Sequence, residues 1–170
     1  MEMEMGRLIC VLAFGWDLEA YEKQGKFTFL EYTPEQVKKI LIEGGGTVEA
    51  LISKTKTKRL VIDSITSFAL LYQDELAKKE ASLALFNMIG DWGCTALLTS
   101  QEAGHEGFFI SSALEFEVDS IIVMYYARTD GTRFRAIEIL KMRGTKHPAK
   151  TFPFAIDAKK GIVLDPMGKV

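Results

Sequence analysis

Polar side chains end two apolar segments of this sequence. The segment "RLVIDSIT" runs from Leu, Val and Ile into Asp63 and Ser64, and "CTALLTSQ" ends on Thr99, Ser100 and Gln101. Apolar runs without polar alternation predict strands that are buried on both faces of a parallel sheet. Because ligands bind at the carboxyl ends of such strands, these carboxylate, hydroxyl and amide groups are candidates for a binding site. The alternative is that Asp63 or Ser64 caps the helix that follows.

Helical patterns surround and separate these two strands. Thr33 before Pro34 is a cap followed by a first-turn proline, so residues 34–45 should form a helix that ends at the glycine run 44–46. Apolar residues at helical spacing predict further helices in 47–58 and 76–93. We also expect a helix with its tail in 7–26 and a short strand in 27–33. A helix between two parallel strands forms a right-handed crossover by default.

The second half of the chain has a different pattern. Residues 119–128 and 133–143 read as two strands, joined by a turn that contains Asp130-Gly131. Residues 150–165 add two short strands around a Lys-Gly turn, with Pro153 at a strand edge. We therefore expect an α/β domain over residues 1–170: a mainly parallel sheet flanked by helices and extended by C-terminal antiparallel strands.

Composition narrows the class of protein. Lys plus Arg is 21 and Asp plus Glu is 23, so the net charge of −2 does not support DNA binding, although it leaves it possible. Cys10 and Cys94 lack CxxC or His spacing, which fits reduced, buried thiols better than a zinc site. No apolar stretch approaches a membrane span and the start is acidic, so we expect a cytoplasmic protein with no membrane partner.

Several segments together resemble a known family. The succession "AFGWDLEAYEKQGK", "RLVIDSIT", "ALLTSQ", "SALEFEVDSIIVM" and "ILKMRGTKH", with the later "FPFAID" and "GIVL", resembles the RecA-like ATPases of the KaiC and archaeal RadA-paralogue type. The match runs over nearly the whole chain, and the order of the segments is more specific than any single motif. The resemblance implies a nucleotide-binding core that assembles into rings or filaments, with ATP and Mg²⁺ held between neighbouring subunits.

The resemblance gives roles to the residues at the two strand ends. The strand matching "LVID" is the Walker B element of the family, and its carboxylate, here Asp63, helps to hold Mg²⁺ through water and is followed by a hydroxyl residue, here Ser64. The segment matching "TSQ" senses the γ-phosphate, which makes Ser100 and Gln101 candidates for that role. The alternative for Gln101 is an ordinary exposed loop residue.

The stretch "KMRGTKH" resembles the segment by which one subunit reaches ATP bound to its neighbour. This nominates Lys141 and Arg143 as phosphate contacts in trans, and His147 could approach the same site. Residues i and i+2 of a strand lie on one face, so both cations can point at the same phosphates. The alternatives are a solvated strand face for the two cations and a surface position for His147.

The phosphate-binding loop of the family is missing from this sequence. That loop reads GxxxxGK[ST], and "EGGGTVEALISK" has glycines without this spacing. We expect a truncated RecA-like fold without the first strand, the Walker A loop and the following helix. Robust ATP hydrolysis by this chain alone is therefore not expected, and ATP and Mg²⁺ would bind weakly or only in a shared site.

Three functional hypotheses follow. The chain is a degenerate KaiC-like protein that serves as a trans-acting or regulatory subunit for a full-length KaiC/RadA-like paralogue. Alternatively, it is a fragment of a complete ATPase, with a role in DNA repair or signalling, whose phosphate loop is encoded upstream. The third hypothesis is an interaction module without nucleotide. Because a truncated sheet exposes apolar surface and a strand edge, we also expect a homo-oligomer.

Overall fold

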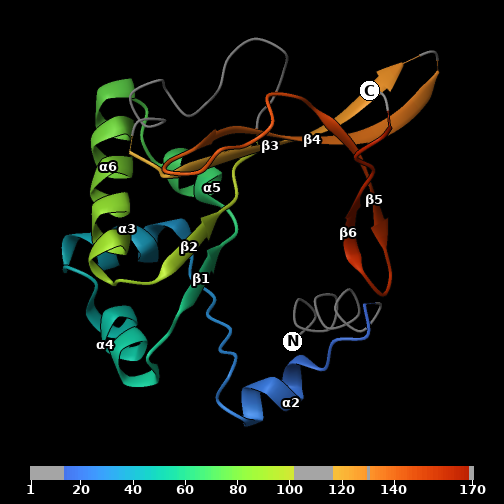
Figure 1. Ribbon diagram of the computed structural model, residues 1–170. Helices are drawn as coiled ribbons and strands as arrows, with labels where there is room; N and C mark the ends of the chain where they lie inside the picture. Colours follow the sequence, from blue (N-terminus) through green and yellow to red (C-terminus); the bar gives the residue numbers. More distant parts are fainter. Residues whose placement is uncertain (1–13, 102–116, 130, 169–170) are drawn as a thin grey trace. The chain divides into compact units, whose positions relative to one another are not determined.

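The computed structural model describes residues 14–101, 117–129 and 131–168, and the chain divides into two compact units (Figure 1). One unit is Phe29–Val118, and the other is Met1–Thr28 together with Asp119–Val170. The first contains a parallel sheet with helices and the second an antiparallel sheet. The predicted mixed α/β class is therefore confirmed.

Helices and two neighbouring strands build the unit Phe29–Val118. Its described elements are α3 (Pro34–Ile42), α4 (Gly46–Thr55), β1 (Arg59–Ile62), α5 (Ile65–Ala69), α6 (Glu75–Asp91) and β2 (Thr95–Leu98). β1 and β2 pair in parallel, from Arg59 opposite Thr95 to Ile62 opposite Leu98. The two strands predicted from the sequence are thus neighbours, and helices lie between them in the chain.

The start of α3 follows from its sequence. The Thr33 hydroxyl accepts a hydrogen bond from the Gln36 backbone N–H at 3.3 Å, and the Gln36 side chain accepts one from the Thr33 N–H at 2.7 Å. This reciprocal pair is a capping box, and Pro34 occupies the first turn, where its missing N–H is not needed.

The glycine run 44–46 is a turn between two helices. Gly44, Gly45 and Gly46 have φ values of 73°, 95° and 50°, which side-chain-bearing residues rarely adopt. A Cβ on Gly45 would lie 3.0 Å from Glu49 Oε2 and 3.3 Å from Trp92 Nε1. These glycines therefore end α3 and begin α4, in agreement with the view that they are not a phosphate loop.

A small core forms where α5 and α6 meet one face of the parallel sheet. Phe68, Leu85 and Ile89 are buried at its centre. Alternate residues of the strands pack against them, together with residues of α3: Leu60, Ile62, Ala96, Leu98, Val37 and Leu41. Burial of these apolar side chains is the main stabilising term for this unit.

The other face of the parallel sheet is not buried as expected. Val61 is 62 % exposed and its strand neighbour Leu97 is 57 % exposed. The prediction of strands buried on both faces is therefore wrong for this chain, because the described helices supply apolar partners to one face of the sheet. The exposed pair agrees with the expectation that the chain leaves apolar surface uncovered.

The predicted strand at residues 27–33 does not form. These residues run as extended chain into α3 without joining either sheet. A β-rich composition favours a strand only where a partner supplies the hydrogen-bonding ladder. Leu30 and Tyr32 instead line a pocket beside β1.

The second unit contains α2 (Leu18–Lys23) and four antiparallel strands in the order β3 (Ser120–Thr129), β4 (Thr132–Met142), β5 (Phe152–Asp157) and β6 (Gly161–Leu164). Thr129 lies opposite Thr132 in the register, which confirms the hairpin predicted from Asp130-Gly131, although Asp130 itself lies outside the described residues. The β5–β6 hairpin confirms the predicted Lys-Gly turn, and Gly161 takes a φ of 72° there.

The described part of the predicted helix at 7–26 is shorter than expected. Asp17 caps α2 by accepting a hydrogen bond from the Ala20 N–H at 2.9 Å, and Gly25 follows the helix with a φ of 67°. Residues 7–13 of the prediction lie outside the described residues.

The described strands form two sheets, one of β1 with β2 and one in the order β3-β4-β5-β6. Pro153 is the second residue of β5, next to the start of the strand, as expected from its predicted place at a strand edge. It is tolerated there because the β4–β5 ladder has only two residue pairs, Ala136 with Pro153 and Ile137 with Phe152.

Two smaller expectations can be compared with the structure. Cys94 is a free, partly buried thiol, whereas Cys10 lies outside the described residues. Within the described ranges, no helix combines the length and the apolar character that crossing a membrane requires.

Candidate functional site

The carboxyl ends of β1 and β2 bring Asp63 and Thr99 together. Ile62 lies opposite Leu98, and the Thr99 N–H continues the ladder by donating to the Ile62 carbonyl at 3.0 Å. The Thr99 hydroxyl donates a hydrogen bond to Asp63 Oδ1 at 2.5 Å. The strand register thus fixes a carboxylate and a hydroxyl side by side at the edge of the sheet, as expected for the ligand-binding end of parallel strands.

The segment after β2 is tied to the start of α5. The Ile65 N–H donates to the Thr99 carbonyl at 3.0 Å, and the Gln101 N–H donates to the Thr66 hydroxyl at 2.9 Å. The hydroxyls of Thr66 and Ser100 are 3.4 Å apart. Ser100 and Gln101 are therefore close to the helix that follows Asp63, and Gln101 makes its contact through the backbone N–H.

The capping alternative for Asp63 and Ser64 is not what the structure shows. Ser64 occupies the N-cap position of α5, but its side chain makes no capping hydrogen bond there. The Asp63 carboxylate accepts from Thr99, and the peptide bond between Asp63 and Ser64 is cis. Neither side chain caps the helix, and both residues line the pocket at the strand end.

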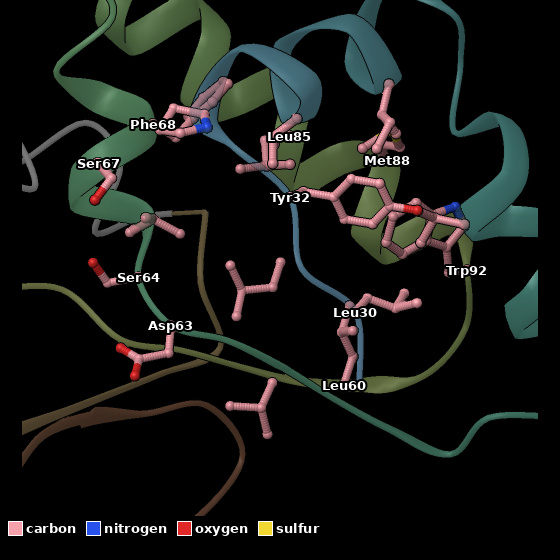
Figure 2. A pocket seen from close by; sticks show the side chains of 17 residues that line it. Leu30, Tyr32, Leu60, Asp63, Ser64, Ser67, Phe68, Leu85, Met88 and Trp92 are labelled. Atoms are coloured by element: carbon pink, nitrogen blue, oxygen red, sulfur yellow. The ribbon is translucent and has the colours of Figure 1, made fainter. Parts of the chain in front are cut away.

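A pocket of about 310 Å³ lies beside this polar edge. Asp63, Ser64 and Ser67 line one side of it, and Tyr32 and Trp92 lie on the other side (Figure 2). The remaining lining is mostly apolar and comes from β1, α3, α4, α5 and α6. The polar groups therefore border an apolar interior.

The oxygen atoms at the strand ends fit a magnesium ion. Mg²⁺ prefers hard oxygen ligands and is commonly held by one or two carboxylates together with water and phosphate oxygens. Asp63 supplies the carboxylate, and Ser64 and Thr99 supply hydroxyls next to it. In the part of the chain that the structure describes, no group of three or more His, Cys, Asp or Glu side chains forms a ready metal site. An ion here would thus depend on Asp63 and on ligands from nucleotide and water.

The three residues nominated for contacts in trans belong to the other unit. Lys141 lies on β4 opposite Ile121, and Arg143 follows the strand. The Arg143 N–H donates to the Asp119 carbonyl at 2.8 Å, and its guanidinium forms an exposed ion pair with the Asp119 carboxylate at 3.4 Å. His147 Nδ1 lies 3.4 Å from the Pro148 carbonyl oxygen.

Sequence reasoning missed two features of this site. It included Thr99 among the polar strand ends without a role of its own, and it did not identify Thr66. The register between β1 and β2 places Thr99 beside Asp63. Aligning "RLVIDSIT" with "CTALLTSQ" as parallel strands, each an apolar run with a polar end, would therefore have predicted this pair. The hydroxyl of Thr66, which lies in the first turn of α5, carried no comparable signal in the sequence.

Comparison with known proteins decides the family. A family model described as "ATPase: KaiC" matches residues 5–169, nearly the whole chain. The chain belongs to the KaiC ATPase family. The resemblance read from the sequence is therefore confirmed, and with it the RecA-like fold.

KaiC relatives of this chain are longer than the matched region. The circadian clock protein KaiC3 of Synechocystis sp. is 30 % identical over 92 % of this chain and 33 % of its own length. A UPF0273 protein of Thermotoga maritima is 33 % identical over 90 % of this chain and 67 % of its own length. A solved KaiC-like protein of Pyrococcus horikoshii superimposes with a TM-score of 0.74 at 32 % identity, covering 92 % of this chain and 68 % of that one. The chain thus spans between one third and about two thirds of these relatives.

Proposed function

We propose that this KaiC-family chain acts as a trans-acting or regulatory subunit that shares Mg-ATP sites with ATP-binding paralogues. The observation that carries the proposal is the Thr99 to Asp63 hydrogen bond at the carboxyl ends of β1 and β2. It holds a carboxylate where a Walker B group is expected in a chain of this family. The 170 residues then belong to one KaiC-like domain, and no GxxxxGK[ST] sequence occurs among them.

Each residue of the proposed site has a separate task. Asp63 holds Mg²⁺ through water, with the Ser64 hydroxyl beside it, and the ion when bound neutralises phosphate charge. Thr99 orients the Asp63 carboxylate through its hydrogen bond. Ser100 and Gln101 follow the state of the γ-phosphate and pass it to α5 through the contact of Gln101 with Thr66.

The cations of the other unit complete the proposal. Lys141 and Arg143 contact phosphates held by a neighbouring subunit, and His147 lies near them in sequence. The ion pair of Arg143 with Asp119 is exposed, and pairs of this kind contribute little stability, so Arg143 can exchange it for a phosphate at small cost. A guanidinium binds phosphate oxygens in a bidentate manner, which favours that exchange.

Hydrolysis by this chain alone is not part of the proposal. The 170 residues contain no GxxxxGK[ST] sequence, so these residues do not supply the backbone cradle and lysine that position the β- and γ-phosphates. We propose a homo-oligomer or a mixed assembly with a full-length KaiC/RadA-like paralogue. The exposed pair Val61 and Leu97 supports association of this kind.

The first test is calorimetric titration of the 170-residue chain with Mg-ATP, alone and mixed with a KaiC-type paralogue, with light scattering to record assembly. We expect weak or no binding alone and an altered ATPase rate of the paralogue in the mixture. Lys141→Ala and Arg143→Ala should each abolish the effect, and Lys146→Ala is the matched control. Asp119→Asn breaks the same ion pair while keeping the Arg143 cation, so it should leave the effect intact.

Two other results would each favour a different function. An in-frame GxxxxGK[ST] upstream of the coding region would favour a complete KaiC-like ATPase, an alternative that the greater length of the relatives supports. A double variant of Lys141 and Arg143 that changes no partner's ATPase rate would favour an interaction module without nucleotide.

A further inference from the structure

Three arginines and a tyrosine share one face of the β3–β4 hairpin near its turn. In the register of the two strands, Arg128 lies directly opposite Arg133, and Tyr126 lies opposite Arg135. Side chains of residues i and i+2 point to the same face of a strand, as do those of directly opposite residues. All four side chains are exposed, Tyr126 by 59 %. We call Tyr126, Arg128, Arg133 and Arg135 the arginine face.

The tyrosine ring gathers two of the three cations. The guanidinium carbons of Arg133 and Arg135 each lie 5.0 Å from the centre of the Tyr126 ring. Such cation–π contacts are favourable at exposed sites and keep the two guanidinium groups close together. The arginine face is therefore organised before any ligand arrives.

Repulsion between the arginines is not offset by an ion pair with a carboxylate of the described residues. Like charges directly opposite each other in a sheet are destabilising, and Arg128 faces Arg133. Among the described residues, no carboxylate forms an ion pair with the three arginines. Glu138 belongs to the opposite face, where it accepts hydrogen bonds from Tyr125 and Thr151 at 2.6 and 2.9 Å.

The local charge contrasts with that of the whole chain. Residues 128–135 contain three Arg and one Asp, which gives 3 − 1 = +2, whereas the chain has a net charge of −2. The Asp is Asp130, in the turn and outside the described residues. A cluster that breaks the local rule of charge pairing, without a compensating carboxylate in the described part of the chain, indicates a partner that supplies negative charge.

We propose that the arginine face binds a single-stranded polynucleotide. Guanidinium groups bind phosphates in a bidentate manner, and both tyrosine rings and guanidinium planes are surfaces on which unpaired bases stack. Exposed Met124 and Ile122 continue the same face along β3 and add apolar surface next to the tyrosine. This site shares β4 with Lys141 but uses other residues than the proposed nucleotide site, and it does not depend on the proposed function.

The test is fluorescence anisotropy of the full 170-residue chain with labelled oligo(dT), oligo(U), a mixed-sequence duplex and a polyglutamate peptide. Three phosphate contacts on a single strand give a slope of log K against log salt of about −2, so a fourfold rise in salt should weaken binding roughly 20-fold. We expect both single strands to bind more tightly than the duplex and the peptide. The ratio of the affinities for oligo(dT) and oligo(U) shows whether the face prefers single-stranded DNA or single-stranded RNA.

Variants decide whether the arginine face is responsible. Arg128→Gln, Arg133→Gln and Arg135→Gln should each reduce the salt slope by about 0.7. Tyr126→Phe keeps the ring and should bind like the parent, whereas Tyr126→Leu should bind more weakly. The double control Lys159→Gln with Lys160→Gln removes two exposed cations of the same unit and should leave the slope unchanged. Circular dichroism melts confirm that each variant is folded.

Three results would overturn the proposal. Absence of single-strand binding at low salt would do so directly. Tighter binding of the duplex would indicate recognition of a groove. Equal binding of polyglutamate, with no effect of Tyr126→Leu, would assign the face to an acidic protein surface.

Discussion

The Thr99 hydroxyl donates a hydrogen bond of 2.5 Å to the Asp63 carboxylate across the carboxyl ends of β1 and β2. This contact joins two residues that lie 36 positions apart in the sequence. It exists because the strands are parallel and in a register that places Ile62 opposite Leu98. A carboxylate has two acceptor oxygens, so a hydrogen bond to Oδ1 leaves the second oxygen to bind a metal ion.

Removal of the Thr99 hydroxyl should loosen Asp63 without damaging the sheet. Thr99→Val keeps the shape and loses the donor, so we expect a loss of about 1 kcal/mol in the free energy of unfolding, measured in urea. Nucleotide-dependent effects on a paralogue should weaken in parallel. Thr99→Ser should restore both, and Thr95→Val at the start of β2 is the matched control. An unchanged paralogue response in Thr99→Val would argue against the orienting role.

The core of the unit Phe29–Val118 depends on one leucine of α6 and not on another. Leu85 is 3 % exposed and packs with Phe68, whereas Leu76 of the same helix is 63 % exposed. Leu85→Ala should lower the free energy of unfolding by about 2–5 kcal/mol, because it removes buried methyl groups and leaves a cavity. Leu76→Ala should change it by less than about 0.5 kcal/mol. Similar losses for the two variants would show that the core is misplaced.

The glycine turn between α3 and α4 should tolerate no side chain at its centre. Gly45 has a φ of 95°, and an added Cβ would lie 3.1 Å from the Glu49 Cβ. We expect Gly45→Ala to destabilise the chain by more than about 1 kcal/mol. Gly90 in α6 has open space around it, so Gly90→Ala should stabilise by about 0.5–1 kcal/mol through its effect on helix propensity. Thermal melts of the two variants should therefore shift in opposite directions.

Asp157 in the β5–β6 turn should make the free energy of unfolding decrease at acid pH. The backbone N–H groups of Lys159 and Lys160 donate to the Asp157 carboxylate and lower the pKa of that group in the folded state. Its contribution to stability is present above the unfolded pKa, about 4, and is lost as the pH falls through the lower folded pKa. Asp157→Asn keeps an acceptor oxygen without a titrating proton, so it should remove this part of the acid dependence.

NMR titration of the Asp157 carboxyl carbon measures that pKa directly. A value at or above the ordinary aspartate pKa would contradict the prediction. Asp157→Ala removes the acceptor altogether and should be less stable than Asp157→Asn at neutral pH, where urea unfolding gives the comparison.

Much of the local structure could be predicted because short-range chemistry determines it. The helix cap at Thr33 before Pro34, the glycine turn and the hairpin at Asp130-Gly131 each depend on residues within a few positions of one another. The strand at residues 27–33 was predicted wrongly because its outcome depends on a distant partner. Burial of Val61 and Leu97 was predicted wrongly for the same reason, since an apolar strand does not encode whether anything covers it.

The sequence by itself determined the class of fold, the family and the polar ends of the two strands, because local patterns and the order of motifs carry that information. Only the tertiary structure decided that Thr99 binds Asp63, that Gln101 contacts Thr66 through its backbone, and that Arg133 and Arg135 meet the Tyr126 ring on one hairpin face. Each of these contacts joins separate segments through a strand register or a helix position. Register is set by pairing and packing across the whole sheet, which no single segment specifies.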